Sequence, residues 1–308
     1  MKSKNVLLLI LFLITIFSCR KIIDYKIPDS GRKLVVNSFF NSEDTIKINL
    51  SKSLHILDDA EYEFINDAVV SIYEDDQFVE NLTFTSNGNY TSNYFIPSQG
   101  KNYKIVAWND DFDEVSAIDY VPNSVLINSV DTATTTFVSQ NGTLNNTIEE
   151  NVYEFNINFD DPSGDNYYMI KMQYIYKYQY EGETFTYLYD IYDLKYNDVI
   201  IEKFLSNQGA VIFSDDLFEG ENLNLSLFVS KYNFYTLQTP VIISLYSISE
   251  AFYKYSISLD EQQNVAGNPF AEPVQVYNNV TDGYGIFAGY SVEKFTVFVD
   301  GEETYYIE

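Results

Sequence analysis

Thiols and imidazoles, the side chains that most often do chemistry in proteins, are almost missing from this chain. It has one cysteine, Cys19, and one histidine, His55. A single residue of each kind cannot build the usual zinc sites, and one histidine offers little for triads or general-base catalysis. One cysteine also allows no internal disulfide. The composition therefore argues against these kinds of active site, and together with the motifs discussed below it leads us to expect no enzymatic activity and no cofactor.

Cys19 itself stands where a lipid could be attached. Lys2 and Lys4 precede an apolar stretch, Val6–Phe17, and Ser18 places a small residue directly before the cysteine. The stretch is about twelve residues long, too short for a bilayer core that takes roughly 20 helical residues. We therefore expect cleavage before Cys19 and acylation of its thiol and new amino group, which would anchor the chain in a membrane. The alternative is an ordinary secretory signal with an incidental cysteine.

Acidic residues far outnumber basic ones. The chain has 45 Asp and Glu against 18 Lys and Arg, and a formal net charge of −27. Nucleic-acid binding requires clustered Lys and Arg that neutralise phosphates, so we expect no nucleic-acid partner. So many carboxylates form pairs by chance, and their spacing cannot select a glycosidase pair. Nucleophile-elbow, phosphate-loop and dinucleotide motifs do not occur in the sequence.

Calcium is the metal that these carboxylates would suit. Asp110, Asp111 and Asp113 crowd one predicted loop, and calcium takes about six to eight oxygen ligands. They lack the Asp-x-Asp-x-Asp-Gly spacing of a dedicated calcium loop, so a solvated turn is the simpler interpretation. We keep these three aspartates as weak calcium candidates.

Tyrosines supply the most suggestive pattern. They occupy alternate positions of one predicted strand and of the strand that would return beside it, so their rings would share one face of a two-stranded ribbon. The six residues are Tyr174, Tyr176, Tyr178, Tyr180, Tyr187 and Tyr189. A four-residue loop at 181–184 would pair Tyr180 with Phe185, Tyr178 with Tyr187, and Tyr176 with Tyr189.

Such a ribbon could serve as a binding surface, because tyrosine offers a large ring and a hydroxyl group. It would suit a glycan, a peptide or a protein partner such as a receptor barrel. The structural alternative is a Tyr-rich core or a contact between domains.

Aromatic residues make up 17% of the chain, and tyrosine and phenylalanine favour strands. After a signal peptide at 1–18 and a lipid-anchored tether at 19–32, residues 33–122 show short β-like runs between turn residues. This pattern predicts an immunoglobulin-like or transthyretin-like β-sandwich. The expected strands are Leu34–Phe40, Thr45–Ser51, Ala68–Tyr73, Phe78–Thr85, Asn89–Phe95, Tyr103–Trp108 and Val115–Val121.

Residues 123–308 are predicted to form a larger, Tyr-rich antiparallel β domain, either a sandwich or an open barrel. One short helix is expected near 250–263, with Ser247 and Glu250 spaced as a capping box. The predicted fold class is therefore mainly β. The expected strands of this region include Val152–Phe159, a long run from Tyr167, Leu223–Val229, Val241–Tyr246 and Phe295–Val299.

Several motifs resemble known families. Residues 67–73, 87–90 and 100–105 are similar to the carboxypeptidase-regulatory-like β-sandwich, which usually serves as a spacer or docking unit. Nearly the whole mature chain resembles domain-of-unknown-function family 4249, lipoproteins of Bacteroidota. The motifs that carry this second resemblance are Asp161–Gly164, Asn166–Tyr168, Ser247–Tyr255, Asn268–Val274, Tyr277–Val280 and Gly283–Tyr290.

The second resemblance implies an outer-membrane lipoprotein, often encoded near TonB-dependent receptors, with no established activity and no catalytic residues. We therefore expect a non-enzymatic accessory of such a receptor, acting in nutrient uptake or receptor assembly. One alternative is direct binding of a glycan or peptide by the tyrosines. Another is a structural or adhesion protein of the envelope. The sequence leaves open whether the protein faces the periplasm or the cell surface.

Overall fold

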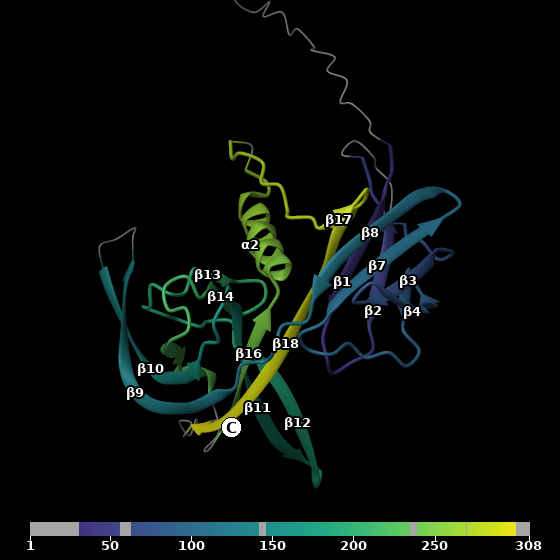
Figure 1. Ribbon diagram of the computed structural model, residues 1–308. Coiled ribbons are helices and arrows are strands. Elements are labelled where there is room, and N and C mark those ends of the chain that lie inside the picture. Colours follow the sequence, from purple (N-terminus) through teal and green to yellow (C-terminus); the bar gives the residue numbers. More distant parts are fainter. Residues whose placement is uncertain (1–30, 56–62, 142–145, 235–238, 269, 300–308) are drawn as a thin grey trace, which may run out of the picture. The chain divides into compact units, whose positions relative to one another are not determined.

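Figure 1 shows the computed structural model, which describes residues 31–55, 63–141, 146–234, 239–268 and 270–299. The predicted signal peptide, Cys19 and almost all of the predicted tether lie outside the described residues. Strands dominate, and α2 (Glu250–Val265) is the one α-helix in the described part of the chain. The predicted fold class, mainly antiparallel β with one helix, is confirmed. Among the described residues, no helix has the length and apolar character needed to cross a bilayer.

The first core lies between two sets of strands. On one side are β1 (Leu34–Phe40), β2 (Lys47–Lys52), β6 (Asn89–Thr91) and β5 (Thr83–Ser86). On the other are β17 (Val280–Thr281), β8 (Phe112–Tyr120), β7 (Asn102–Asn109), β3 (Val69–Glu74) and β4 (Gln77–Asn81). Alternate residues of each strand fill the space between them, because side chains point to opposite faces with a period of two. Val36, Ile48, Leu50, Ile72 and Ile105 are among those fully buried there.

The predicted strand Phe78–Thr85 is in fact two strands, β4 and β5. Leu82, which lies between them, is buried, and its N–H donates to the Val70 carbonyl at 2.8 Å. β4 pairs with β3, whereas β5 pairs with β6, so the chain changes sheets at Leu82. The alternating pattern continues through this point and therefore did not reveal the break. The other strands predicted for this region are present, with ends shifted by a few residues.

The second core has the same two-layer construction. One layer contains β13 (Lys203–Leu205), β14 (Ala210–Ser214), β11 (Tyr167–Tyr180), β16 (Thr239–Ile248) and β18 (Tyr284–Val299), with β12 (Glu183–Asp190) beside β11. The opposite layer contains β15 (Asn222–Ser230), β10 (Asn146–Asp160) and β9 (Ile127–Asn141). A short 3-10 helix, η1 (Lys231–Asn233), follows β15. Buried residues from both layers pack together, among them Ile170, Met172, Phe155 and Leu225.

β18 belongs to both cores. Its first part pairs in parallel with β1, with Gly285 opposite Val36, and its second part pairs antiparallel with β16. One layer of the first core and one layer of the second core are thereby joined into one ten-stranded sheet. Val280 and Phe287, from the end of the chain, are buried in the first core. The division into domains at residue 122 stays a prediction, but the first core is completed by residues far beyond it.

This crossing explains the glycines of the motif Gly283–Tyr290. A Cβ atom on Gly285 would lie 1.9 Å from the Val36 carbonyl oxygen, and one on Gly289 would lie 2.0 Å from the Tyr120 carbonyl oxygen. Both distances are far inside van der Waals contact. Only glycine lets the backbones approach this closely.

The helix α2 packs beside β18 on the face of the long sheet that points away from the second core. The ring centroids of Phe252 and Phe39 are 4.6 Å apart. Ser249 is the N-cap, and its hydroxyl accepts the N–H of Phe252 at 3.2 Å. The predicted cap, Ser247, is wrong, because that residue is still paired within β16, opposite Tyr168 of β11.

Candidate functional site

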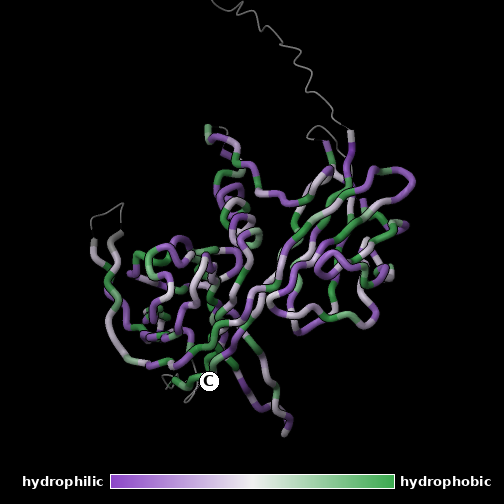
Figure 2. The backbone as a smooth tube through the Cα atoms, in the orientation of Figure 1, coloured by the Kyte–Doolittle hydropathy of each residue, from purple (hydrophilic) through white to green (hydrophobic). Residues whose placement is uncertain are grey.

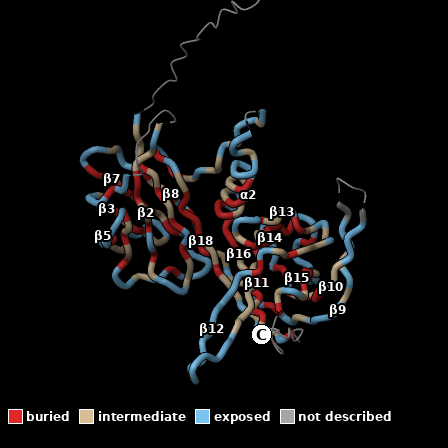
Figure 3. The backbone as a smooth tube through the Cα atoms, turned by 180° about the vertical axis from the view of Figure 1, so that it is seen from behind, coloured by how far each residue is buried: buried red, intermediate tan, exposed pale blue. Residues whose placement is uncertain are grey.

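The predicted tyrosine pattern forms a β-hairpin, β11 and β12, that extends past the second core. The core ends near Tyr174, whose ring packs edge-on against Phe234 at 5.9 Å. Beyond Tyr174, β11 becomes progressively exposed, and every residue of β12 is exposed (Figure 3). We call the aromatic residues on this face the tyrosine ribbon: Tyr174, Tyr176, Tyr178, Tyr180, Phe185, Tyr187 and Tyr189.

The turn of this hairpin differs from the predicted one. Glu181 and Gly182 form a two-residue turn, with positive φ angles of 49° and 85°. Two positive φ angles match the type I′ turn, whose twist suits a two-stranded ribbon. Tyr178 therefore pairs with Phe185 and not with Tyr187, and the predicted pairing is wrong by two residues. A shift of two leaves every ring on the predicted face, because the faces of a strand alternate with a period of two.

Several rings of the tyrosine ribbon stack on one another across the two strands. Tyr178 lies 5.2 Å from Phe185 and 5.8 Å from Tyr187 between ring centroids, with interplanar angles of 18° and 4°. Tyr174 and Tyr189 stack at 5.4 Å. A hydrogen bond with Tyr187 is the main cause that raises the pKa of Tyr178. The ribbon is therefore an ordered stack of rings.

The outer part of the tyrosine ribbon lies on the surface. The exposed fractions are 39% for Tyr178, 42% for Tyr187 and 61% for Tyr180. Figure 2 colours this part of the hairpin largely white to purple, in contrast to the green stretches within the cores. The structural alternative, a Tyr-rich core, thus applies to Tyr174 alone among these residues. The rings of Tyr178, Phe185 and Tyr187 stack on one another, so they partly cover each other's faces and do not form a flat platform.

The weak calcium candidates lie at the turn between β7 and β8. Asn109 stabilises that turn, because its side-chain oxygen accepts the N–H groups of Asp111 and Phe112 at 3.2 and 3.0 Å. Within the described ranges, no three or more His, Cys, Asp or Glu side chains come together in a way that could hold a metal ion. Asp110, Asp111 and Asp113 act here as residues of a tight turn and its flanking strand.

A groove of about 750 Å³ lies between α2 and residues 275–278. Several of its polar residues have partners within the protein. The Tyr253 hydroxyl donates to Glu202, and the Ser258 hydroxyl accepts the N–H of Tyr277 at 2.8 Å. The first contact attaches the helix to the residue before β13, and the second attaches the segment after the helix to the helix itself.

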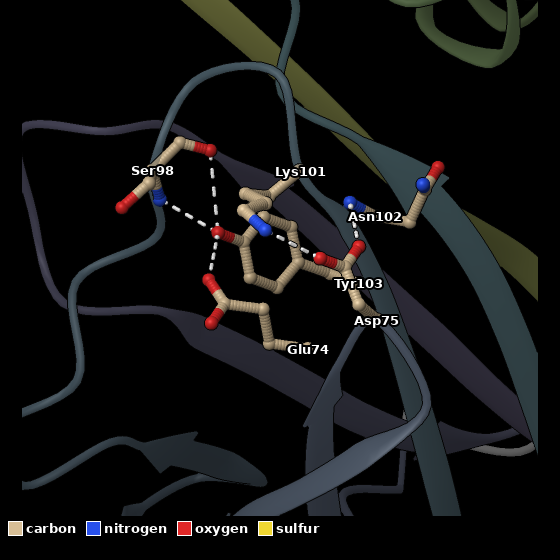
Figure 4. Close-up of polar contacts among 6 residues, drawn as sticks. All are labelled: Glu74, Asp75, Ser98, Lys101, Asn102 and Tyr103. Carbon is tan, nitrogen blue, oxygen red and sulfur yellow. Dashed lines mark hydrogen bonds and ion pairs between the residues drawn. The ribbon is translucent and has the colours of Figure 1, made fainter.

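A second polar cluster lies at one end of the first core (Figure 4). The Tyr103 hydroxyl donates to Glu74 at 2.9 Å and accepts the N–H of Ser98 at 2.6 Å. Beside it, Lys101 Nζ lies 2.6 Å from Asp75 Oδ2, and this contact lowers the pKa of Asp75. Burial raises the pKa of the Tyr103 hydroxyl, which keeps its proton at neutral pH. The polar groups of this cluster therefore bond to one another, and they hold the loop at Ser98 and the turn at Asp75 in place.

Asp119 is a buried acid that sequence reasoning missed. It lies in β8 on the inward face, in line with Val115 and Ala117. Its Oδ2 accepts hydrogen bonds from the Ser249 hydroxyl and from the Gly289 N–H, the latter at 2.8 Å. Burial raises the pKa of Asp119 to about 6. The available signal was an acid at an inward position of an alternating strand.

Asp161, from the motif Asp161–Gly164, is a second buried acid that accepts hydrogen bonds from two other segments of the chain. Its Oδ1 accepts the hydroxyl of Tyr168, and its Oδ2 accepts the N–H of Gly220 at 2.7 Å. The carboxylate thereby ties the start of β11 to the turn before β15. Asp161, Ser249, Gly285 and Gly289, all from motifs that carry the family resemblance, thus serve the fold, whereas the exposed part of the tyrosine ribbon has no such role in either core.

A model of a protein family matches residues 20–296 of the chain, and the family is described as Domain of unknown function (DUF4249). No curated protein matches the chain.

Proposed function

The chain belongs to the DUF4249 family, and on that premise we propose that it is a non-enzymatic binding protein that docks a partner with its tyrosine ribbon. The observation that carries the proposal is the exposure of an ordered aromatic surface, with Tyr178, Tyr180 and Tyr187 exposed by 39%, 61% and 42%. Aromatic residues are enriched in protein interfaces and often carry most of the binding energy.

The order of the ribbon supports the same proposal. Tyr178 is held between Phe185 and Tyr187, at 5.2 and 5.8 Å. Binding therefore immobilises few rotamers, and the entropy cost of association is lower than for freely rotating side chains. Tyrosine also combines a large contact area with a hydroxyl donor, which suits a surface that must be soluble when unoccupied.

We further propose that acylated Cys19 anchors the protein in the outer membrane and that the partner is a TonB-dependent receptor. The support is the short apolar stretch before the lone cysteine and the implication of the family resemblance. In this proposal the protein assists nutrient uptake or receptor assembly, and the tyrosine ribbon forms the contact with the receptor. No cofactor takes part.

Co-purification from detergent-solubilised membranes tests the proposal. Wild-type protein should recover a receptor, whereas the double variant Tyr178→Ala/Tyr187→Ala should not. The matched control, Tyr94→Ala/Tyr232→Ala, removes two other tyrosines that are 92% and 75% exposed, and it should recover as much receptor as wild type. Wild-type protein that purifies without a receptor, or a ribbon variant that still recovers one, would contradict the proposal.

Direct capture of a glycan or peptide is a second candidate, favoured by Tyr180. This residue closes β11 at the turn, is 61% exposed and takes part in none of the ring stacks of the described residues. A ring outside the stack can lie flat against a sugar or a peptide. Tyr180→Ala alone should then abolish binding in a glycan or peptide array, whereas Tyr94→Ala/Tyr232→Ala should leave that binding unchanged.

A further inference from the structure

The outer edge of β12 is an open sheet edge. β12 pairs with β11 on one side, from Gln173 opposite Asp190 to Tyr180 opposite Glu183, and no described strand pairs with its other side. All eight of its residues are exposed. An unpaired edge presents a row of backbone N–H and C=O groups that can pair with another chain.

The two-residue turn determines which backbone groups point outward. In such a hairpin the residues that flank the turn, Tyr180 and Glu183, exchange both hydrogen bonds, and the pattern then alternates along the ladder. Phe185 and Tyr187 therefore direct their N–H and C=O groups toward β11. Thr184, Thr186 and Leu188 direct theirs away from it, to the open edge.

This edge lacks the features with which proteins usually prevent unwanted pairing. Edge strands are commonly protected by proline, by lysine, by a bulge or by short length. β12 reads Glu-Thr-Phe-Thr-Tyr-Leu-Tyr-Asp, without proline or lysine, and its register with β11 has no shift. Its six central residues are of four types, Thr, Phe, Tyr and Leu, and the first three types are strongly enriched in strands.

We infer that the partner adds an extended segment to this edge as a further β-strand, beside the tyrosine ribbon. The inference rests on the proposed docking function and specifies its mode. Main-chain hydrogen bonds to Thr184, Thr186 and Leu188 would supply affinity, and the rings of Phe185 and Tyr187 would contact alternate side chains of the added strand.

Charge selects the occupant. Glu183 stands at one end of β12 and Asp190 at the other, Glu181 lies in the turn, and the chain carries a net charge of −27. The fitting segment is therefore uncharged in its centre and basic at its ends. A second copy of this chain fits poorly, because it would bring its own Glu181, Glu183 and Asp190, and the same negative net charge, to this acidic edge.

Synthetic peptides test the inference on the full chain. The probe is a peptide of alternating threonine and valine with two lysines at each end, and its control carries glutamates in place of the lysines. The lysine peptide should bind, and the glutamate peptide should bind at least about tenfold more weakly, a difference of about 1.4 kcal/mol. Binding by the glutamate peptide alone, or by neither peptide at millimolar concentration, overturns the inference.

Amide hydrogen exchange locates the contact without any variant. The lysine peptide should slow exchange at Thr184, Thr186 and Leu188, whose N–H groups point outward, while Phe185 and Tyr187 are already protected by β11. Binding without new protection at the three outward amides would show that the peptide occupies the rings and not the edge.

Thr186→Pro removes one outward N–H and keeps the ladder to β11, because proline is tolerated where the N–H of an edge strand faces solvent. We expect this variant to bind the lysine peptide at least about tenfold more weakly than wild type does. Thr186→Val, the control of matched shape, should bind as wild type does. If Tyr178→Ala/Tyr187→Ala loses the receptor while Thr186→Pro keeps both receptor and peptide, strand addition is wrong and the proposed function stands. If none of the variants changes receptor recovery, both are wrong.

Discussion

Asp119 and Ser249 lie 130 positions apart in the sequence, and the Ser249 hydroxyl donates a hydrogen bond to the Asp119 carboxylate in the interior. The same carboxylate oxygen accepts the N–H of Gly289 at 2.8 Å. Asp119 belongs to β8, Ser249 caps α2, and Gly289 belongs to β18. One buried acid therefore connects the first core, the helix and the strand that joins both cores.

Asp119 should make stability depend on pH in a defined direction. Its pKa in the folded protein is about 6, whereas an aspartate in an unfolded chain titrates near 3.9. Between these values the unfolded chain has released the proton and the folded protein still holds it. The free energy of unfolding should therefore fall as pH rises from about 4 to about 6, by up to about 3 kcal/mol from this residue.

Asp119→Asn removes this titration and keeps an oxygen that can accept the Gly289 N–H. Urea unfolding at several pH values should show a smaller loss of stability between pH 4 and pH 6 than in wild type. Equal slopes for the two proteins would mean that Asp119 does not titrate in this range.

The N-cap of α2 can be tested with two neighbouring serines. Ser249→Ala removes the cap on Phe252 and one partner of Asp119, so we expect a loss of about 2 kcal/mol in the free energy of unfolding. Ser247→Ala should be nearly neutral, because the Ser247 hydroxyl is buried and no described group is bonded to it. Chemical denaturation of both variants provides the comparison. Equal losses of unfolding free energy in the two variants would contradict the assignment of Ser249 as the cap.

Gly289 should tolerate no side chain. A Cβ atom there would lie 2.0 Å from the Tyr120 carbonyl oxygen, so Gly289→Ala must displace β8 or β18 and should cost several kcal/mol, about 3 or more. Gly267 is the control, because its φ of 81° is strained for alanine, but among the described residues beyond its chain neighbours no atom lies within 4 Å of the added Cβ. Gly267→Ala should cost only about 1 kcal/mol. Thermal unfolding of both variants distinguishes a clash from backbone strain.

The tyrosine ribbon should contribute little to folding, as expected for a binding surface. Tyr178→Ala should reduce the free energy of unfolding by only about 1 kcal/mol, because it removes stacking on an exposed hairpin. Tyr168→Phe, a smaller change, should cost about 2 kcal/mol, because it leaves the buried Asp161 carboxylate without its hydroxyl donor. The reverse order of the two losses in urea titrations would identify the ribbon as a stabilising element.

The sequence by itself determined the features that depend on neighbours along the chain. Alternation of apolar and polar residues located β1 at Leu34–Phe40 as observed, and it placed all the ribbon tyrosines on one face. That face survived a wrong hairpin register, because the error of two residues equals the period of a strand. The family resemblance likewise rests on short local motifs.

Only the tertiary structure decided what depends on residues distant in the sequence. The parallel pairing of β1 with β18, the partners of Asp119 and the exposure of Tyr178 all follow from which segments meet in space. Whether a ring is buried depends on how far the opposite layer extends, and that layer reaches Tyr174 through Phe234 but does not cover the rest of the hairpin. The pattern of a strand specifies which side chains share a face, whereas strands from elsewhere in the sequence decide whether that face is buried.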